Sequence, residues 1–479
     1  MGLFLLTLLS LAIDSRVQAA LKAWDVPGVA VVVVTPEHTL YLKGHGRRDA
    51  AGRPVTPDTV FPLASCTKAF TTALIARLAD EGKISWDDPV RKHVPDFRLS
   101  DPAADALVVL RDLAAHRTGV GSHDLMWYRS PWSQAEMVRR VGRLPLAKPF
   151  RTEMQYQTVM YIAAGQAAAA AGGKPWAELV REKILDPLGM TDFCLTSTEA
   201  ARRPDRAGGF REIGGAVKAV DEYPQPEPNC AVSAHASARE LIPWLRFQLT
   251  GGRHGEDQLV SEAALRETQA PHTPILLDAG GRAVNPDAHL VAYALAWVAQ
   301  DYRGHLLVQH TGLIDGYRAH LTLLPNDGYA FAILANRQGT RLNLALSNTL
   351  VDLLVGLPGR DWNAIQRQAL DEARAVAQVQ ARREDLARRP DLPPSVGLEQ
   401  LAGEYEDAAY GKGKVVAGAD GLTWEWGTWK LPLEHYARDT FRFRTDDDRL
   451  DRMMVRFRVE DGTVKGVHLF GVPFARTGK

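Results

Sequence analysis

Residues 61–79 read FPLASCTKAFTTALIARLA and carry a Ser-x-x-Lys motif at Ser65 and Lys68, the one such motif in the sequence. The apolar positions that follow recur at helical spacing: Phe70, Ala73, Leu74 and Leu78. Gly82 stands where a helix usually ends. We therefore predict an amphipathic helix that begins at Ser65. Because residues three apart share a helix face, the hydroxyl and the amine should lie within hydrogen-bond reach of each other.

Strand patterns lie on both sides of this helix in the sequence. Residues 28–35 are a nearly pure valine run, and a short turn joins them to a second strand pattern at residues 39–44. Residues 306–334 hold three apolar runs separated by Asp-Gly and Pro-Asn-Asp-Gly turns, as in an antiparallel meander. We expect one sheet, covered by helices over residues 12–24 and 342–355. The middle of the chain should form a second, helical lobe, so the predicted fold class is a split α/β arrangement.

The carboxy-terminal part of the sequence has a different pattern. Residues 361–388 are charged and helical in spacing, and three prolines follow within residues 389–396. Beyond them, apolar residues alternate as in strands: Leu422, Trp424, Trp426, Met453, Val455, Phe457 and Val459. We predict a first domain over residues 1–357, a helical linker over 358–393 and a small β-barrel domain over 394–479.

Composition limits the classes of partner. The 479 residues include 57 Lys plus Arg and 57 Asp plus Glu, so no excess charge of one sign attracts nucleic acid or anionic lipid. Cys66, Cys194 and Cys230 lie far apart without a C-x-x-C motif, which predicts neither a disulfide framework nor a thiolate metal site. We expect a small-molecule or short-peptide substrate, no metal and no cofactor, and leave a homo-oligomer open.

The start of the sequence is ambiguous as a targeting signal. Residues 3–13 are apolar like the core of a signal peptide, but no Lys or Arg precedes them. Ile13, Val17, Leu21 and Trp24 recur at helical spacing, so a cleavage near residue 19 would cut a helix of the fold. We therefore expect a cytoplasmic protein, with a periplasmic or secreted one as the alternative. No later apolar run approaches the ~20 residues of a membrane span.

The Ser-x-x-Lys motif suggests nucleophilic chemistry. A lysine acts as a base only when its neutral form is accessible, and burial and the positive end of a helix both lower a lysine pKa. Lys68 could then accept the proton of the Ser65 hydroxyl. The alternative is a helix N-cap followed by a surface lysine. Cys66 is a rival nucleophile, but one helical position rotates it about 100° from that face, so we expect a buried apolar role.

Two further segments carry candidate site residues. Tyr156 and Thr158 stand directly before a helical run over residues 159–171, where a loop can project a phenol and a hydroxyl toward a ligand. The alternatives are a half-buried aromatic and a helix N-cap. Residues 310–313 (HTGL) end a predicted strand, where glycine permits a ligand to approach the backbone and the N–H of Leu313 can donate to an oxyanion. A lone strand histidine is otherwise structural.

The order of these motifs resembles a known family. Ser65-x-x-Lys68, Tyr156-x-Thr158 and His310-Thr311-Gly312 are similar to motifs of the class C serine β-lactamases, the penicillin-binding DD-peptidases, and the related D-aminopeptidases and esterases. Flanking segments agree: residues 113–120 (LAAHRTGV), 187–190 (PLGM) and 293–297 (YALAW). The resemblance covers about residues 11–355 and implies the β-lactamase-like fold.

The resemblance also implies roles for the candidate residues. Ser65 would be the nucleophile, Lys68 its base and Tyr156 a proton carrier to the leaving group. The N–H groups of Ser65 and Leu313 would form the oxyanion hole. The remaining candidates are His310 as a further catalytic residue, and Thr158, Thr311 and Gly312 as substrate-binding residues. His116, within the LAAHRTGV segment, is interpreted as structural.

The sequence departs from the family at two positions. Thr158 stands where the family usually has Asn, which removes an amide that can both donate and accept hydrogen bonds. His310 stands where the lactamases and DD-peptidases usually have Lys, and His is instead similar to the aminopeptidase and esterase branches. Histidine is mostly uncharged at neutral pH, with a reference pKa of ~6.5, so a free substrate carboxylate would be held less firmly.

The β domain, with LAGEY at residues 401–405, resembles the lipocalin-like barrel appended to some family peptidases, which helps to assemble or gate those enzymes. The alternative is a satellite domain whose aromatic residues form only its own core. The resemblance implies a metal-independent serine hydrolase acylated at Ser65, which cleaves small esters or amides of short peptides with D-residues. The alternatives are β-lactam hydrolysis, a penicillin-binding sensor or scaffold without turnover, and a carbohydrate- or protein-binding module.

Overall fold

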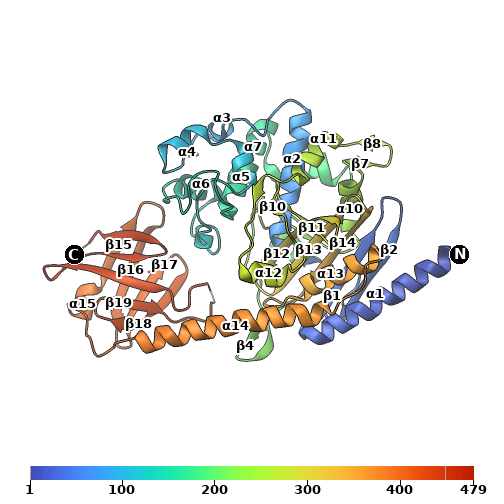
Figure 1. Ribbon diagram of the computed structural model, residues 1–479. Coiled ribbons are helices and arrows are strands. Elements are labelled where there is room, and N and C mark those ends of the chain that lie inside the picture. The colour runs from blue at the N-terminus through green and yellow to red at the C-terminus, as the bar shows by residue number, and fades with distance from the viewer. Residues whose placement is uncertain (1, 448, 479) are drawn as a thin grey trace. The chain divides into compact units, whose positions relative to one another are not determined.

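A large antiparallel sheet organises the first half of the fold. The structure is a computed structural model that describes residues 2–447 and 449–478. In the described chain, the sheet order is β2-β1-β14-β13-β12-β11-β10-β9 (Figure 1). Its strands are β1 (Gly28–Val34), β2 (Thr39–Gly46), β9 (Thr273–Pro274), β10 (Val291–Tyr293), β11 (Val298–Tyr302), β12 (His305–Ile314), β13 (Tyr317–Leu324) and β14 (Tyr329–Ala335). Val29 pairs with Ala335, so the early hairpin and the late meander share one sheet, as predicted.

Helices cover both faces of the central strands. On one face, α1 (Gly2–Trp24) and α13 (Leu342–Leu354) form a core in which Ile13 and Leu346 pack with Val31. From the opposite face, α10 (Leu241–Leu249) packs against β1, β13 and β14. All seven residues of β1 are buried as a result. A strand covered on both faces has no solvent side, which explains its valine run.

A helical lobe follows β2 and carries the Ser-x-x-Lys segment. Its helices are η1 (Ala64–Cys66), α2 (Thr67–Asp80), α3 (Val90–His93), α5 (Leu110–Ala114), α7 (Thr158–Gly172), α8 (Trp176–Val180), η3 (Arg181–Leu185), α9 (Ser197–Ala201), α11 (Glu262–Gln269) and α12 (Ala279–Val284). Short strand pairs accompany them: β3 (Phe61–Pro62) with β6 (His235–Ala236), β4 (Gly209–Ile213) with β5 (Ala216–Val220), and β7 (Arg253–His254) with β8 (Asp257–Gln258). Helix α2 packs against α7, and most of its residues are buried.

The chain divides into two compact units. The first runs to residue 95 and includes residues 107–119 and 147–373. The second consists of residues 96–106, residues 120–146 and the chain from residue 374. Helices that lie wholly or partly in the second unit are α4 (Pro102–Leu107), η2 (Asp124–Met126), α6 (Gln134–Val141), α14 (Trp362–Ala387) and α15 (Leu398–Leu401).

A closed β-barrel forms most of the second unit. In the described residues its strands are β15 (Gly403–Asp407), β16 (Gly411–Gly418), β17 (Gly421–Trp426), β18 (Trp429–Ala437), β19 (Thr440–Phe443), β20 (Met454–Glu460), β21 (Thr463–Leu469) and β22 (Val472–Arg476). They follow in sequence order and β15 pairs with β22, which makes an up-and-down barrel. Buried aromatic side chains such as Tyr405, Trp424 and Phe474 form its core. The predicted barrel is thus confirmed.

Residues 120–146 pack on this barrel. The ring centroids of Trp132 and Trp426 lie 5.3 Å apart, and His123 Nδ1 lies 2.9 Å from the hydroxyl of Tyr410. Aromatic residues of the barrel therefore form its core and also contact residues 120–146 of the same unit.

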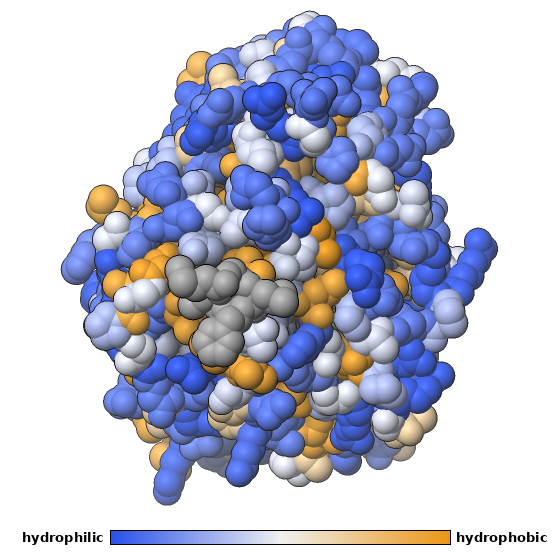
Figure 2. All heavy atoms as spheres, turned by 90° about the vertical axis from the view of Figure 1, so that its right-hand side faces the viewer, coloured by the Kyte–Doolittle hydropathy of each residue, from blue (hydrophilic) through white to orange (hydrophobic). Residues whose placement is uncertain are grey.

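Helix α1 has a buried and an exposed part. Ile13, Val17 and Trp24 are buried, as their helical spacing predicted, and Leu6 and Leu11 are exposed. Figure 2, viewed from the side at which α1 begins in Figure 1, shows hydrophobic side chains within a mostly hydrophilic surface. None of the described helices has both the length and the apolar character needed to cross a lipid bilayer.

Candidate active site

A close backbone approach places Ser65 beside strand β12. A Cβ atom built on Gly312 would lie 2.0 Å from the carbonyl oxygen of Leu63, so only glycine allows this contact. Ala64, directly before Ser65, has φ +47°, a left-handed conformation that costs free energy in a residue other than glycine. The predicted helix start at Ser65 needs a correction. Ser65 lies in the 3₁₀ turn η1, and α2 begins at Thr67. The left-handed Ala64 and the backbone contact between Leu63 and Gly312 constrain the chain at this point.

The lysine of the motif faces the serine. Lys68 Nζ lies 3.1 Å from Ser65 Oγ and donates at 3.1 Å to the carbonyl oxygen of Ala231. The whole residue is 0% exposed, and burial disfavours the charged form of an amine. The same nitrogen lies 5.1 Å from the ring centroid of Tyr156 and 5.4 Å from that of Tyr161. The structure therefore brings Ser65, Lys68 and Tyr156 together.

The segment before α7 holds Tyr156 in a half-buried position. The cap of α7 differs from the N-cap alternative for Thr158: the side chain of Gln157 accepts the backbone N–H of Val159 at 3.0 Å. Thr158 is instead the first residue of the helix and is 2% exposed. Its burial leaves little of its side chain for a substrate to contact.

Strand β12 brings His310, Thr311, Gly312 and Leu313 to the same region. It pairs with β13 through Ile314, but its pairing with β11 ends at Gln309. Residues 310–314 therefore have one edge that carries no neighbouring strand of this sheet. The backbone of Leu313 lies on this segment, and the residue as a whole is 45% exposed.

His310 is buried and neutral. Its Nε2 lies 3.0 Å from the hydroxyl of Tyr293. Burial is the largest cause that lowers the pKa of His310 from 6.5 to about 3. The ring therefore carries no positive charge near neutral pH.

Cys66 is a poor nucleophile here. Its thiol is fully buried and lies 3.4 Å from the carbonyl oxygen of His310. Burial raises the pKa of the Cys66 thiol to about 12, so the thiolate is scarce at neutral pH. This agrees with the predicted apolar role. Among the described residues, no group of three or more His, Cys, Asp or Glu side chains is arranged to hold a metal ion.

Three aromatic residues near the motifs were missed as site residues. The ring of His116 lies 4.2 Å from that of Tyr156, and Tyr161 and Tyr293 surround the same histidine. Burial raises the pKa of both Tyr161 and Tyr293 well above 10, so they stay protonated. Their sequence signals were present: His116 lies in LAAHRTGV and Tyr293 begins YALAW. These sequence segments alone do not show which of the aromatic side chains lie close to Lys68.

Comparisons with known proteins agree with the fold and the motifs. Residues 13–355 match the family described as Beta-lactamase, and residues 387–478 match a domain of unknown function, DUF3471. A relative named unguisins hydrolase ungD' from Aspergillus campestris is 29% identical over 424 residues, covering 82% of this chain and 75% of that protein.

Two solved structures share the fold. An octameric penicillin-binding protein homologue from Pyrococcus abyssi has a TM-score of 0.64 and 21% identity, covering 97% of this chain and 99% of that one. The D-amino acid amidase from Ochrobactrum anthropi SV3 has a TM-score of 0.57 and 22% identity, covering 76% and 99% of the two chains. The chain belongs to the beta-lactamase family, and the expectation of a hydrolase of this superfamily is confirmed.

Proposed function

We propose that the protein is a serine hydrolase that passes through a covalent acyl-enzyme on Ser65. The observation that carries this proposal is the 3.1 Å contact between Ser65 Oγ and the amine of the fully buried Lys68. A hydroxyl is a weak nucleophile on its own, and a base within hydrogen-bond distance activates it.

In the acylation step, Ser65 Oγ forms a bond to the substrate carbonyl carbon while Lys68 Nζ takes the hydroxyl proton. The π electrons of the carbonyl move onto its oxygen, where the N–H groups of Ser65 and Leu313 donate to it. Collapse of this intermediate breaks the bond to the leaving nitrogen or oxygen. Tyr156 supplies the leaving group with a proton and regains one from Lys68, whose amine lies 5.1 Å from its ring centroid.

Deacylation reverses these roles with water as the nucleophile. Water attacks the ester carbon on Ser65 and gives its proton to the same basic groups. The bond to Ser65 Oγ then breaks, and the serine recovers its proton as the acid product leaves. Each step is a proton transfer combined with a carbonyl addition or elimination.

The substrate class follows from the charge around His310. A lysine at this position could pair with a substrate carboxylate, whereas His310, with its pKa lowered to about 3 mainly by burial, is uncharged at neutral pH. We infer a preference for neutral esters and for amides of short peptides with D-residues over substrates with a free carboxylate. The relatives named as an unguisins hydrolase and a D-amino acid amidase support amide or ester cleavage.

A comparison of Ser65→Ala with the wild type tests the proposal. The substrates are p-nitrophenyl acetate, the amides of D-alanine and L-alanine, and nitrocefin. We expect Ser65→Ala to lose at least about 1000-fold in kcat/KM. Ser15→Ala, at an exposed position of α1, is the control and should keep full activity.

Mass spectrometry after treatment with a fluorophosphonate should locate the adduct on Ser65. Undiminished hydrolysis by Ser65→Ala would overturn the proposal. A penicillin adduct on Ser65 that forms but never turns over, with no hydrolysis of any substrate, would instead establish the sensor alternative.

A further inference from the structure

His116 forms hydrogen bonds with both sequence neighbours of Tyr156. The N–H of Gln155 donates to the carbonyl oxygen of His116 at 2.7 Å, and the N–H of Gln157 donates to its Nδ1 at 3.3 Å. The ring of His116 also lies 4.2 Å from the ring of Tyr156. One histidine thus contacts the phenol ring and holds the residue before it and the residue after it.

This contact requires one tautomer of His116. Since Nδ1 accepts a hydrogen bond, the ring proton must lie on Nε2. The ring is fully buried, and burial is the largest cause that lowers the pKa of His116 well below 6.5. The ring is therefore neutral near pH 7, where Nδ1 can accept the hydrogen bond from Gln157.

The turn that carries His116 is held in an unusual conformation. His116 has φ +52°, in the left-handed region. The two carbonyl groups before it are also fixed, since Tyr161 Oη donates to the oxygen of Ala114 at 2.6 Å and Thr273 Oγ1 donates to that of Ala115 at 2.9 Å. Three successive carbonyl groups therefore have defined donors from α7, from β9 and from the Tyr156 segment.

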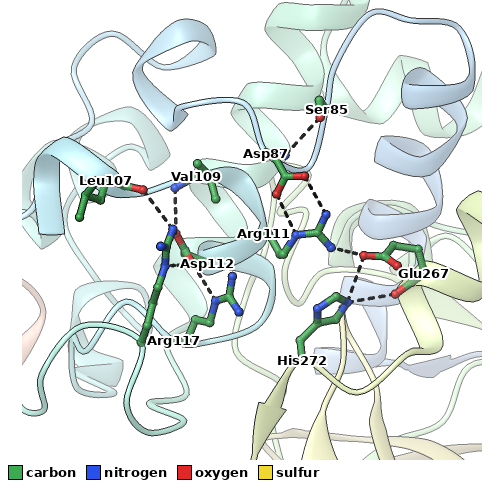
Figure 3. Close-up of polar contacts among 10 residues, drawn as sticks. Ser85, Asp87, Leu107, Val109, Arg111, Asp112, Arg117, Glu267 and His272 are labelled. Carbon is green, nitrogen blue, oxygen red and sulfur yellow. Dashed lines mark hydrogen bonds and ion pairs between the residues drawn. The ribbon is translucent and has the colours of Figure 1, made fainter.

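A buried carboxylate ties this turn to the Tyr156 segment. Asp112 has no exposed side-chain surface. Its carboxylate accepts hydrogen bonds from two arginine side chains: from Arg117 Nε at 2.6 Å, and from Arg151 Nε at 2.9 Å and Nη2 at 2.7 Å. It also accepts a hydrogen bond from the backbone N–H of Val109 at 3.0 Å. Figure 3 shows Arg117 and the N–H of Val109 directed at this carboxylate. Arg117 follows His116, and Arg151 lies five residues before Tyr156 in the printed sequence.

The helix that presents Asp112 is anchored as well. Arg111, the preceding residue, donates to Asp87 at 3.0 Å and pairs with Glu267 of α11 (Figure 3). The ring Nε2 of His272 lies 3.2 Å from the carbonyl oxygen of Glu267. Asp112 is therefore a fixed point rather than a mobile surface charge.

Arg151 has a conformation that suits glycine better. Its φ is +65°, and its backbone N–H donates to the carbonyl oxygen of Arg117 at 2.8 Å. If this position served only to form a turn, glycine would form it with less backbone strain than Arg151. The arginine side chain adds the two-point contact with Asp112, which joins residues 112–117 to the segment that ends at Tyr156.

We propose that His116 is a positioning residue for Tyr156, and that Asp112, Arg117 and Arg151 form the frame that fixes it there. This inference rests on the proposed function, because Tyr156 is the proton carrier in that mechanism. The frame sets the distance between the phenol and Lys68 without touching the substrate. A misplacement of about 1 Å at such a group can lower a rate about 100-fold.

Four variants test the frame. Arg151→Gly removes the two-point contact with the buried Asp112 but relieves the strained backbone, so we expect a lower Tm in a protein that still folds, because Arg117 remains paired with Asp112. In this variant kcat should fall about tenfold while KM stays within about threefold. Arg151→Lys should recover part of the loss. His116→Ala should lower kcat about 100-fold, whereas His116→Asn should be milder because Asn tolerates a positive φ and offers an acceptor near the place of Nδ1.

A matched control removes an exposed ion pair of the same unit, Arg239 with Asp58 at 2.6 Å. Arg239→Gln should leave kcat and its pH profile unchanged. In His116→Ala, the limbs of the kcat profile should move by about half a pH unit, since the proton carrier has moved. A purely structural role would change Tm and not this profile.

The outcomes separate the two proposals. If Ser65→Ala abolishes hydrolysis but Arg151→Gly and His116→Ala fold and retain the wild-type kcat, the frame is wrong and the proposed function stands. If Ser65→Ala hydrolyses as well as the wild type, the proposed function itself is wrong. If His116→Ala does not fold, the kcat of Arg151→Gly alone tests whether the frame positions Tyr156.

Discussion

The Cβ atom that Gly312 lacks would lie 2.0 Å from the carbonyl oxygen of Leu63. Strand β12 and the chain entering Ser65 therefore touch backbone to backbone. This contact joins two segments that are distant in the sequence, and it places the motif around His310 beside the motif around Ser65.

The first prediction concerns this contact. Gly312→Ala should force β12 away from Leu63, lowering the free energy of unfolding by about 1–3 kcal/mol and nearly abolishing hydrolysis. Urea unfolding and ester hydrolysis measure the two effects. Gly359→Ala, at an exposed glycine with nothing within 4 Å of an added Cβ, is the matched control and should be neutral. Normal activity in Gly312→Ala would contradict the proposed arrangement.

The second prediction concerns Lys68. Lys68→Met removes the base but keeps a side chain of similar volume in a fully buried position, so the fold should be retained. We expect kcat/KM to fall about 1000-fold and fluorophosphonate labelling of Ser65 to slow in parallel. Lys83→Met, on the surface, should leave both rates unchanged. Rapid labelling in Lys68→Met would mean that another group activates the serine.

The third prediction is a loss of stability in acid. Burial, the largest cause, lowers the pKa of His310 to about 3, that of His320 to about 4 and that of His116 well below 6.5. The unfolded chain binds protons on these rings from about pH 6.5 downward, and the folded chain does not. Stability is therefore fully present above pH 6.5 and falls as the pH drops toward 3 to 4.

Proton binding by the unfolded chain at His310 and at His320 should each lower the free energy of unfolding by about 2 kcal/mol between pH 7.5 and pH 5, and His116 should act in the same direction. Urea unfolding at these two pH values measures the change. A variant such as His320→Gln should show a shallower dependence on pH than the wild type. Equal slopes in the two proteins would show that His320 does not contribute.

The fourth prediction concerns Cys66. Because its thiol is buried and burial raises its pKa to about 12, iodoacetamide should not modify it in the folded protein. Cys66→Ala should retain most of the activity and lose about 1 kcal/mol of stability from the smaller side chain. Peptide mapping after alkylation and an ester assay provide the measurements. If Cys66→Ala were inactive with Ser65 intact, the choice of nucleophile would be wrong.

Much of the fold followed from local patterns. The i, i+3 spacing of Ser65 and Lys68 already placed the two on one face, and the turn residues between Leu306 and Leu334 marked the meander. The valine run of β1 and the alternating tryptophans of the barrel predicted strands. These are short-range consequences of helix and strand geometry, so a sequence is enough to derive them.

Other features depend on tertiary contacts and could not be predicted from local sequence patterns. The 3₁₀ turn at Ser65 and the N-cap at Gln157 differ from the local expectation because long-range contacts constrain the backbone there. Leu63 touches Gly312 of β12, and the N–H of Gln157 donates to His116. The sequence predicts only a structural role for His116, since nothing in its spacing shows that both neighbours of Tyr156 form hydrogen bonds with it. The packing of residues 120–146 on the barrel likewise has no local signal.

The sequence alone determined which residues could carry the chemistry, because hydroxyl, amine, phenol and imidazole groups recur there in a recognisable order. Only the tertiary structure decided that Lys68 is fully buried, that His310 is neutral and that His116 holds Tyr156. The physical reason is that burial and long-range hydrogen bonds depend on contacts between segments that only the folded chain brings together.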